Sequence, residues 1–289
     1  MKETGLITGE YVNTVIRKRK RELHKGEAGR VLVIAGSKGM AGAAILCCRG
    51  ALRAGAGLVT AAVPEALVPI LQTAVPEATC ITRETFSNLE LSGYDAIAAG
   101  PGLGDDAGNV ELIERILNEY GKTVVLDADG LNTLARCDRV AQLKRASAQV
   151  IITPHMGEAR RLLSMIKYQP INHRQALADK LVETTGATVV LKGPGTLVTS
   201  VSFHSYTNTT GNPGMATGGT GDVLTGIIAA LAGQGLSPLD AARAGVYVHG
   251  LAGDLAAEML SEYGMTAGDL ADMTALAFKK ILKSENQIE

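Results

Sequence analysis

Short continuous runs of apolar residues recur along the first two thirds of the chain, and each is followed by turn residues and a helical pattern. Runs of this length predict strands that are buried on both faces of a sheet. The predicted strands are 31–36, 58–63, 96–99, 123–127, 149–153 and 188–191. The helices predicted between them cover about 42–54, 107–120, 157–166 and 172–185. Strands that alternate with helices indicate an α/β fold with a mainly parallel sheet covered on both faces.

The pattern changes in the last third of the chain. Two short and more polar runs, 196–200 and 203–207, predict an antiparallel pair of strands at the edge of the sheet. After a glycine-rich loop the pattern is only helical. These predicted helices cover about 219–233, 238–261 and 267–284. No linker rich in Pro, Gly or Ser and no internal repeat divides the chain, so we predict one domain over residues 1–289.

Composition and charge narrow the possible partners. Hydrophobic residues make up 46% of the chain and aromatic residues 3%, so the core is expected to be aliphatic. The net charge of −1 creates no global field that would attract nucleic acid or a membrane. The basic run Arg17–Arg21 fits a solvated helix end, a set of cations near an anionic small-molecule site of this or a neighbouring subunit, or a nucleic-acid or localisation patch.

Two further features of the sequence concern the cellular location of the protein and the state of its cysteines. The sequence has no apolar leader and no uninterrupted apolar run of about 18 residues, so we expect a cytoplasmic protein without a membrane span. The four cysteines form neither a C-x-x-C pair nor a zinc-type spacing with histidine. They are Cys47, Cys48, Cys80 and Cys137. We expect buried free thiols at all four positions.

The most informative segment is the loop Asn212–Asp222, which runs directly into an apolar helix. The first turn of a helix has free backbone N–H groups and a partial positive charge, and glycine lets the main chain approach a phosphate closely. A carboxylate at such a site would repel the bound anion, so its presence there indicates a chemical role of its own. Asp222 is therefore expected to remove the proton of a hydroxyl group that attacks the phosphate.

Ligands of open α/β sheets bind at the carboxyl ends of the strands, so we expect the binding residues in the segments that follow each strand. Gly36–Ala44 is glycine-rich but matches neither G-x-G-x-x-G nor the Walker A pattern, and it fits a tight turn as well as a nucleotide-binding turn. The alternating glycines of Gly100–Gly104 indicate close approach of the backbone to a ligand. Asp127, Asp129 and Asn132 could hold magnesium directly or through water, or bind ribose hydroxyls, and Asp129 fits the N-cap of the next helix equally well.

Two more strand ends carry charged side chains. A lone histidine is usually structural and a glutamate in a first helical turn usually serves the helix dipole, but at this position His155 could contact a substrate and Glu158 could organise metal-bound water. Lys192, at the end of a buried strand, needs a negative partner. That partner is either a nucleotide phosphate or a structural carboxylate.

Six segments at the strand ends, in this order, resemble the ADP/ATP-dependent NAD(P)H-hydrate dehydratases, a family with the ribokinase-like fold. The similarity extends from about residue 10 to residue 285 and implies a three-layer α/β/α architecture with a mainly parallel central sheet. The six segments are Val31–Gly36 with Gly42–Ala44, Gly100–Gly104, Leu126–Asn132, Thr153–Glu158, Leu191–Thr196 and Asn212–Asp222.

The resemblance implies repair of NADHX or NADPHX, the cofactors damaged by addition of water across the C5=C6 bond of the nicotinamide ring. Asp222 would take the proton of the C6 hydroxyl as its oxygen attacks the terminal phosphate of ADP. Phosphate would then leave, giving NAD(P)H, AMP and inorganic phosphate. Backbone amides would stabilise the transferred phosphoryl group. These amides belong to Gly218, Gly219, Thr220 and Gly221.

The resemblance also implies binding roles. The hydrated cofactor would contact Ala43, Gly104, His155 and Asp222. The nucleotide would contact Gly221 and the loop that comprises Lys192, Gly193, Pro194, Gly195 and Thr196. Magnesium would bridge the nucleotide phosphates near Glu158. Members of the family often form homotetramers, and the NAD(P)HX epimerase domain of its bifunctional members is expected here on a separate polypeptide.

Two alternatives stay open. One is a small-molecule kinase of the same fold, such as a thiazole or hydroxymethylpyrimidine kinase, which would use Asp222 identically. The other is a nucleotide-binding sensor without catalysis. Related kinases often carry Asn-x-x-Glu where this chain has His155-x-x-Glu158, and this difference favours the dehydratase. The bacterial members suggest ADP rather than ATP, and the residue pattern does not distinguish NADHX from NADPHX.

Overall fold

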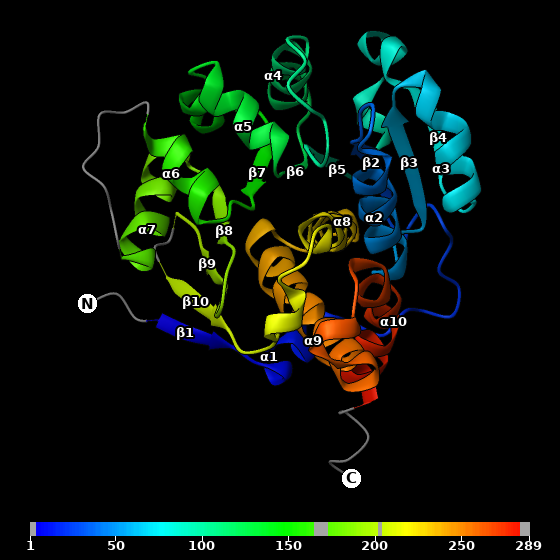
Figure 1. The fold of residues 1–289 in the computed structure, drawn as a ribbon, viewed down its shortest axis with the longest axis vertical. Coiled ribbons are helices and arrows are strands. Elements are labelled where there is room, and N and C mark those ends of the chain that lie inside the picture. Colours follow the sequence, from blue (N-terminus) through cyan, green and yellow to red (C-terminus); the bar gives the residue numbers. More distant parts are fainter. Residues whose placement is uncertain (1–3, 165–172, 202–203, 284–289) are drawn as a thin grey trace.

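The computed structural model describes residues 4–164, 173–201 and 204–283. Its centre is a ten-stranded sheet. The strands are β1 (Thr4–Ile7), β2 (Arg30–Ile34), β3 (Leu58–Val63), β4 (Thr79–Thr82), β5 (Ala96–Ala99), β6 (Thr123–Leu126), β7 (Gln149–Ile152), β8 (Thr188–Leu191), β9 (Leu197–Thr199) and β10 (Ser205–Asn208). They lie side by side in the order β1-β10-β9-β8-β7-β6-β5-β2-β3-β4 (Figure 1).

Most neighbouring strands are parallel, so their carboxyl ends open on the same edge of the sheet. The run from β8 through β7, β6, β5, β2 and β3 to β4 is parallel throughout. The strand β9 is antiparallel to both β8 and β10, and β1 lies parallel to β10 at the outer edge. Because β6, β7 and β8 are adjacent and parallel, the residues that follow them are brought together.

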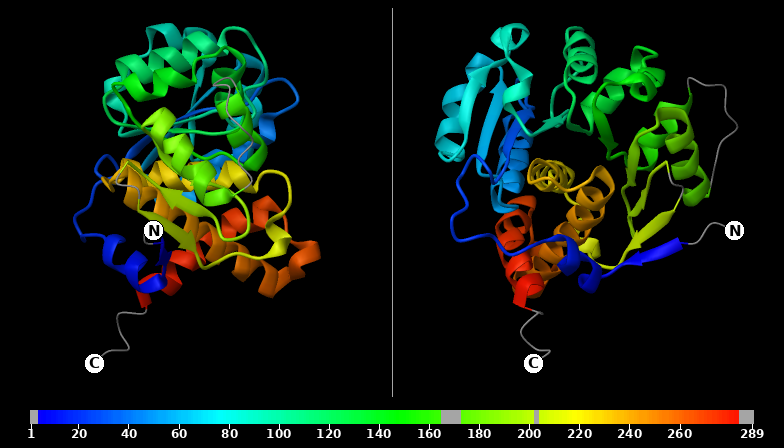
Figure 2. Two further views of the ribbon diagram at one scale, coloured as in Figure 1. Left: turned by 90° about the vertical axis from the view of Figure 1, so that its left-hand side faces the viewer. Right: turned by 180° about the vertical axis from the view of Figure 1, so that it is seen from behind.

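Helices cover both faces of the sheet and complete a three-layer α/β/α arrangement (Figure 2). One apolar core joins the sheet to α1, α2, α3, α8, α9 and α10, and the other joins it to α4, α5, α6 and α7. The strand β2 shows the division, since Val31 and Val33 belong to the first core and Leu32 and Ile34 to the second. The helices are α1 (Gly9–Val15), α2 (Ala41–Arg53), α3 (Val68–Ala74), α4 (Asn109–Glu119), α5 (Asp129–Arg136), α6 (Met156–Ser164), α7 (Arg174–Thr185), α8 (Thr220–Gly233), α9 (Pro238–Gly264) and α10 (Ala267–Lys283).

The predicted α/β/α layers and the eight predicted strands are confirmed, with two corrections at the edges of the sheet. The antiparallel pair β9 and β10 is not the edge, because β1 extends the sheet beyond it. The short strand β4 at the opposite edge was not predicted. Phe203, and the predicted helical positions 165, 166, 172 and 284, lie outside the described residues.

The core is aliphatic, as expected, but the expectation for the cysteines is only half right. Cys47 and Cys48 are buried on α2, and burial raises the pKa of both thiols. Cys80 and Cys137 are partly exposed instead. None of the helices within the described ranges combines the length and the hydrophobicity that crossing a bilayer would require.

Candidate active site

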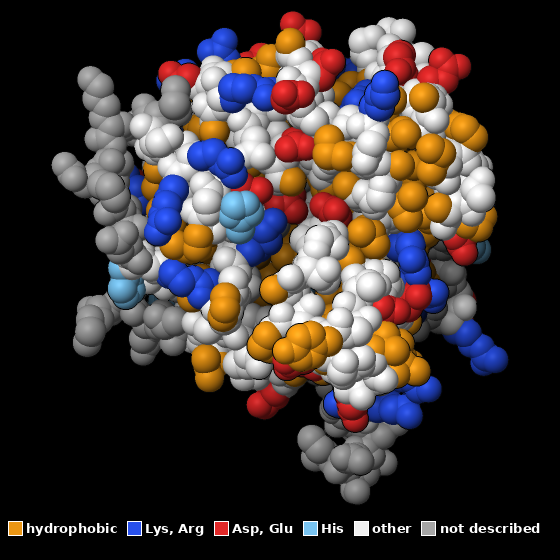
Figure 3. Space-filling view, viewed as in Figure 1, with side chains coloured by type: hydrophobic (Ala, Val, Ile, Leu, Met, Phe, Trp, Pro, Cys, Tyr) orange, Lys and Arg blue, Asp and Glu red, His pale blue; other side chains and the backbone are white. Residues whose placement is uncertain are grey.

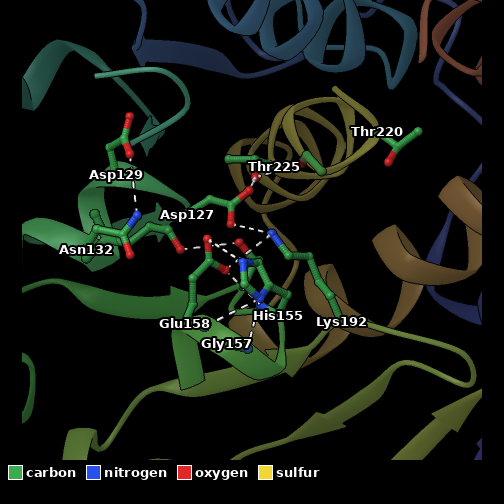
Figure 4. A network of polar contacts seen from close by, with 12 residues as sticks. Asp127, Asp129, Asn132, His155, Gly157, Glu158, Lys192, Thr220 and Thr225 are labelled. Atoms are coloured by element: carbon green, nitrogen blue, oxygen red, sulfur yellow. Dashed lines mark hydrogen bonds and ion pairs between the residues drawn. The ribbon is translucent and has the colours of Figure 1, made fainter. Parts of the chain in front are cut away.

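The carboxyl ends of β6 and β8 carry an ion pair beneath the first turn of α8 (Figure 4). Nζ of Lys192 lies 2.6 Å from Oδ1 of Asp127, which is 1% exposed. The Thr225 hydroxyl of α8 donates to the other oxygen of this carboxylate at 2.8 Å. Of the two partners predicted for Lys192, the structure therefore supplies a carboxylate of the protein, and this pair ties the sheet to α8.

Lys192 remains charged although it is largely buried. Burial opposes the charge, but Asp127 and then Glu158, whose Oε2 lies 3.9 Å from Nζ, outweigh it and raise the pKa of Lys192. The ammonium group of Lys192 thus lies between the carboxylates of Asp127 and Glu158. Figure 3 shows acidic side chains gathered in a recess in the middle of this face, with basic side chains and a histidine around it.

Asp222 lies in the first turn of α8, next to this ion pair. The preceding residue, Gly221, lies close to the ion pair. A Cβ atom at Gly221 would be only 3.3 Å from Nζ of Lys192. Burial and the Asp127 carboxylate raise the pKa of Asp222 to about 7, while Lys192 acts in the opposite direction. No hydrogen bond or ion pair engages this carboxylate within the described residues. An unpartnered carboxylate that titrates near neutrality is suited to accept a proton.

The start of α8 has the geometry of an anion site. Gly219 precedes the helix with φ +94° and provides no capping side chain. The first intrahelical bond runs from the N–H of Val223 to the carbonyl of Gly219, so the N–H groups of the three residues before Val223 have no intrahelical acceptor. The positive φ favours glycine at this position, and a Cβ atom there would lie 2.3 Å from the side chain of Leu46, which would have to shift.

His155 and Glu158 form a reciprocal cap at the start of α6. The Nδ1 atom of His155 accepts the N–H of Gly157 at 2.9 Å, and Oε2 of Glu158 accepts the N–H of His155 at 2.8 Å. Nε2 of the ring lies 3.4 Å from Oε1 of Glu158. This is a capping box with a histidine at the N-cap, and an asparagine could make the same backbone contacts. The presence of histidine instead of asparagine in this cap therefore does not distinguish a dehydratase from a kinase. The imidazole side chain is 53% exposed, so it can still contact a ligand.

The loops after β2, β5 and β6 contact one another. A Cβ atom at Gly102 would lie 2.7 Å from Cβ of Ala43, so the backbones approach closely there. The N–H of Gly104 donates to Oδ2 of Asp129 at 2.8 Å. The predicted N-cap role of Asp129 is wrong, because Ala128 precedes α5 and Asp129 is its first residue. These contacts place Gly104 beside Asp129, and Ala43 of α2 against the loop that carries Gly104.

The loop of Lys192 to Thr196 turns sharply between β8 and β9. The Thr196 hydroxyl donates to the carbonyl of Gly193 at 3.0 Å. Arg174 of α7 donates to the carbonyl of Leu191 at 3.2 Å and also to that of Pro194. The loop is thus held from α7, and its first residue faces α8.

Two residues of α9 that sequence reasoning missed hold the glycine loop in place. Asp254 accepts the N–H of Gly211 and the amide of Asn212, each at 3.0 Å. Nε2 of His249 lies 2.8 Å from the carbonyl oxygen of Thr220, so this nitrogen carries the proton and donates it. Burial lowers the pKa of His249 to about 4, which keeps the ring neutral. In the sequence, this histidine looks like an ordinary core residue of an apolar helix.

The basic run lies elsewhere. It follows α1 as non-helical chain, and Arg17 and Arg19 line a separate cavity of about 660 Å³ beside the C-terminal end of α8. Arg19 donates to the carbonyl of Gly55 and, at 3.3 Å, to Gln234. Asp222 is at the opposite end of α8, so within one subunit these cations do not face the predicted site.

The described residues contain no group of three or more His, Cys, Asp or Glu side chains arranged to hold a metal ion. The carboxylate of Glu158 is engaged by His155 through both oxygens. Asp127 is likewise committed to Lys192 and Thr225. The residues therefore do not fit a metal bound directly by the protein.

Comparison with known proteins agrees with this arrangement. Residues 31–275 match the family of NAD(P)H-hydrate dehydratases. The chain is 40% identical to the bifunctional NAD(P)H-hydrate repair enzyme Nnr of Moorella thermoacetica, over 98% of this chain and 55% of that protein. The chain thus spans about half the length of its bifunctional relatives.

A second relative is matched over nearly its whole length. The chain is 38% identical to the ADP-dependent (S)-NAD(P)H-hydrate dehydratase of Neisseria meningitidis, over 93% of this chain and 92% of that protein. The ADP/ATP-dependent NAD(P)H-hydrate dehydratase of Bacillus subtilis, co-crystallised with ATP and Mg²⁺, superposes with a TM-score of 0.84 at 30% identity, covering 96% of this chain and 99% of the other. The ribokinase-like fold is confirmed. The chain therefore belongs to the NAD(P)H-hydrate dehydratase family.

Proposed function

We propose that this protein is an ADP-dependent (S)-NAD(P)H-hydrate dehydratase, a hydro-lyase that repairs NADHX and NADPHX. The observation that carries this proposal is the Asp222 carboxylate at the start of α8, which has no partner among the described residues and has a pKa raised to about 7. A base next to free helix N–H groups suits a hydroxyl group that attacks a phosphate. Family membership supplies the identity of that hydroxyl group.

In the first step, Asp222 takes the proton of the C6 hydroxyl as the hydroxyl oxygen bonds to the terminal phosphorus of ADP. The bond between this phosphorus and its bridging oxygen breaks, and AMP leaves. The N–H groups of Gly218, Gly219, Thr220 and Gly221 are proposed to stabilise the negative charge on the phosphoryl group in transit. Such preorganised donors are worth most at the point where charge develops.

In the second step, the C6–O bond breaks and the phosphate leaves with the oxygen that the substrate brought. The lone pair of the adjacent ring nitrogen displaces it, and loss of a proton from C5 restores the C5=C6 bond. This order explains why a kinase fold can perform a dehydration. Phosphorylation converts a poor leaving group into a good one, and the ring completes the reaction.

The substrate contacts are proposals that the arrangement supports. Ala43 in the first turn of α2 packs against the loop that carries Gly104, and the exposed edge of His155 can meet the hydrated ring. The nucleotide is placed along Lys192, Gly193, Pro194, Gly195 and Thr196, with Gly221 beside Lys192. Magnesium is expected to enter with the nucleotide as part of the co-substrate, since the residues that the structure describes offer no direct ligand set. Glu158 would act on it only through water.

Incubation of the protein with NADHX and ADP tests the proposal. Recovery of the near-ultraviolet absorbance of the dihydronicotinamide ring, together with equal amounts of AMP and inorganic phosphate, is the expected result. A stable phosphoester would instead indicate the small-molecule kinase. Absence of turnover with retained nucleotide binding would indicate the sensor. Repeating the assay with ATP and NADPHX settles the preferences for ADP and NADHX.

Several other expectations remain predictions. They are a single domain over residues 1–289, a cytoplasmic location, a homotetrameric assembly and cooperation with an NAD(P)HX epimerase. The (S) specificity makes the epimerase useful, because it would convert the other epimer into the substrate. Analytical ultracentrifugation measures the assembly directly.

A further inference from the structure

A second hollow continues from the substrate side of the site, beyond Gly104. It has a volume of about 600 Å³ and lies between α5 and α6, with Gly104 in its lining. Cavities of this size hold part of a dinucleotide. Since Gly104 belongs to both the proposed substrate site and this hollow, a substrate that touches Gly104 can extend into it.

The lining of the hollow combines two kinds of polar group. Asp129, Asn132 and Arg136 are spaced three and four residues apart on α5 and therefore share one face of that helix. Arg161 joins them from α6. The carboxylate of Asp129 is held in place by the N–H of Gly104 at 2.8 Å and the amide of Asn132 at 3.4 Å.

The two arginines differ from several others of the protein in having no carboxylate partner in the described part of the chain. Within the described residues neither Arg136 nor Arg161 forms an ion pair, although Asp129 and Asp105 line the same hollow. Elsewhere Arg139 is paired with Glu114 at 2.9 Å, and Arg49 with Asp272 at 2.8 Å. Both guanidinium groups are thus available to an anion that enters the hollow.

We propose that Arg136 and Arg161 bind a phosphate of the hydrated dinucleotide, while Asp129 and Asn132 face an adjoining ribose. This inference rests on the proposed function. A guanidinium group presents a planar fork of N–H donors that matches phosphate oxygens, and an acidic side chain is the usual partner of ribose hydroxyls in dinucleotide sites. The hollow offers both chemistries in a cavity that adjoins the proposed reaction site.

The experiment compares Arg136→Gln and Arg161→Gln with Arg160→Gln, an exposed arginine of α6 that does not line the hollow. For each variant, KM and kcat are measured with NADHX and with NADPHX, and binding of NADH and NADPH is measured by calorimetry. Loss of one charge-assisted contact predicts a rise in KM of about tenfold at nearly unchanged kcat. Arg160→Gln should match the wild type.

The KM values of the two arginine variants show which phosphate of the substrate the arginines bind, or that they bind none. A rise with both substrates assigns the arginines to the diphosphate bridge, and a rise with NADPHX alone assigns them to the 2′-phosphate. If both variants match Arg160→Gln in KM and in calorimetry, the inference is overturned. If the wild type turns over neither hydrate, the proposed function fails, but weaker NADPH binding in the two variants would still support the phosphate site.

Discussion

Nζ of Lys192 lies 2.6 Å from Oδ1 of Asp127, and this pair directly underlies the helical turn that carries Asp222. The two charges act on Asp222 in opposite directions. Asp127 adds to the effect of burial and raises the pKa of Asp222, while Lys192 lowers it. Burial is the main cause of the raised pKa of Asp222, and the two charges of the ion pair adjust the pH at which the proposed base becomes active.

Neutralising either partner should move the acid limb of kcat/KM in a predictable direction. Lys192→Met removes the cation and should shift the limb to higher pH, because the carboxylate of Asp222 loses its attraction. Asp127→Asn removes the neighbouring negative charge and should shift it to lower pH. The measurement is a pH profile of kcat/KM, which reports the free enzyme. Shifts in the same direction would contradict this account.

The same variants should also have a lower free energy of unfolding, which is measured together with the pH profile. Removing one partner of a buried ion pair typically costs about 3–5 kcal/mol, because the other charge is left unpaired. Lys192→Met should therefore unfold at lower denaturant concentration than the wild type. The double variant Lys192→Met/Asp127→Asn should regain part of the loss, since neither charge remains buried alone.

The wild-type enzyme should lose activity as the pH falls through about 7, because Asp222 must be deprotonated to act. Asp222→Asn should lose nearly all turnover at every pH while still binding ADP. A profile that stays flat down to about pH 5 would exclude a base of this kind.

Stability provides an independent test of the same group. The pKa of Asp222 is raised on folding from 3.8 to about 7, so the folded state binds the proton more tightly. Its ionisation therefore destabilises the folded state as the pH rises between these values, by up to about 4 kcal/mol. Asp222→Asn should be more stable than the wild type near about pH 8, and the difference should vanish near about pH 4. Equal stability at both values would contradict a raised pKa.

His249 is expected to act as a positioning residue. Its ring donates to the carbonyl of Thr220 at 2.8 Å, two residues before Asp222. His249→Leu should lower kcat by about tenfold or more with a smaller change in KM, because small displacements of a reacting group are costly. His249→Gln retains an N–H donor and should recover part of the rate. The acid limb should stay in place, since His249 is neutral throughout this range. Equal effects of Leu and Gln would argue against positioning.

Adjacent glycines of the loop offer a matched pair. Gly219→Ala places a methyl group 2.3 Å from Leu46 on a backbone with φ +94°, whereas a Cβ atom at Gly218 meets nothing within 4 Å. Gly219→Ala should lose about 1–3 kcal/mol of stability through this strain, and Gly218→Ala should keep nearly the wild-type melting temperature. Differential scanning calorimetry makes the comparison. Similar melting temperatures for the two variants would contradict the required geometry.

The sequence predicted the layers and the strand ends well because parallel strands buried on both faces leave unbroken apolar runs. It missed β1 and β4, which are four residues each and lie at the edges of the sheet. In the β4 segment two of the four residues are threonines, so no apolar run marks it. Edge strands are exposed along one side, and their pattern carries less information.

The site was predicted less completely than the fold. The sequence singles out Asp222 because a carboxylate beside an anion-binding turn needs an explanation, and its role as the base stays a prediction. The roles of Asp127 and His249 were not resolved, because each depends on a partner 65 or 29 residues away along the chain. The capping box of His155 and Glu158 is local in the sequence, but the pattern does not predict it, because histidine is not a usual N-cap residue.

The central claim is that the C6 hydroxyl oxygen is phosphorylated and then leaves with the phosphate. NADHX labelled with ¹⁸O at this hydroxyl group tests it directly, with mass spectrometry of the inorganic phosphate after turnover with ADP. The account predicts that the phosphate carries the label, because the substrate oxygen forms the new P–O bond and the C6–O bond breaks. Label recovered in water instead, with unlabelled phosphate, would mean that ADP hydrolysis and dehydration are separate events and would contradict the proposed role of Asp222.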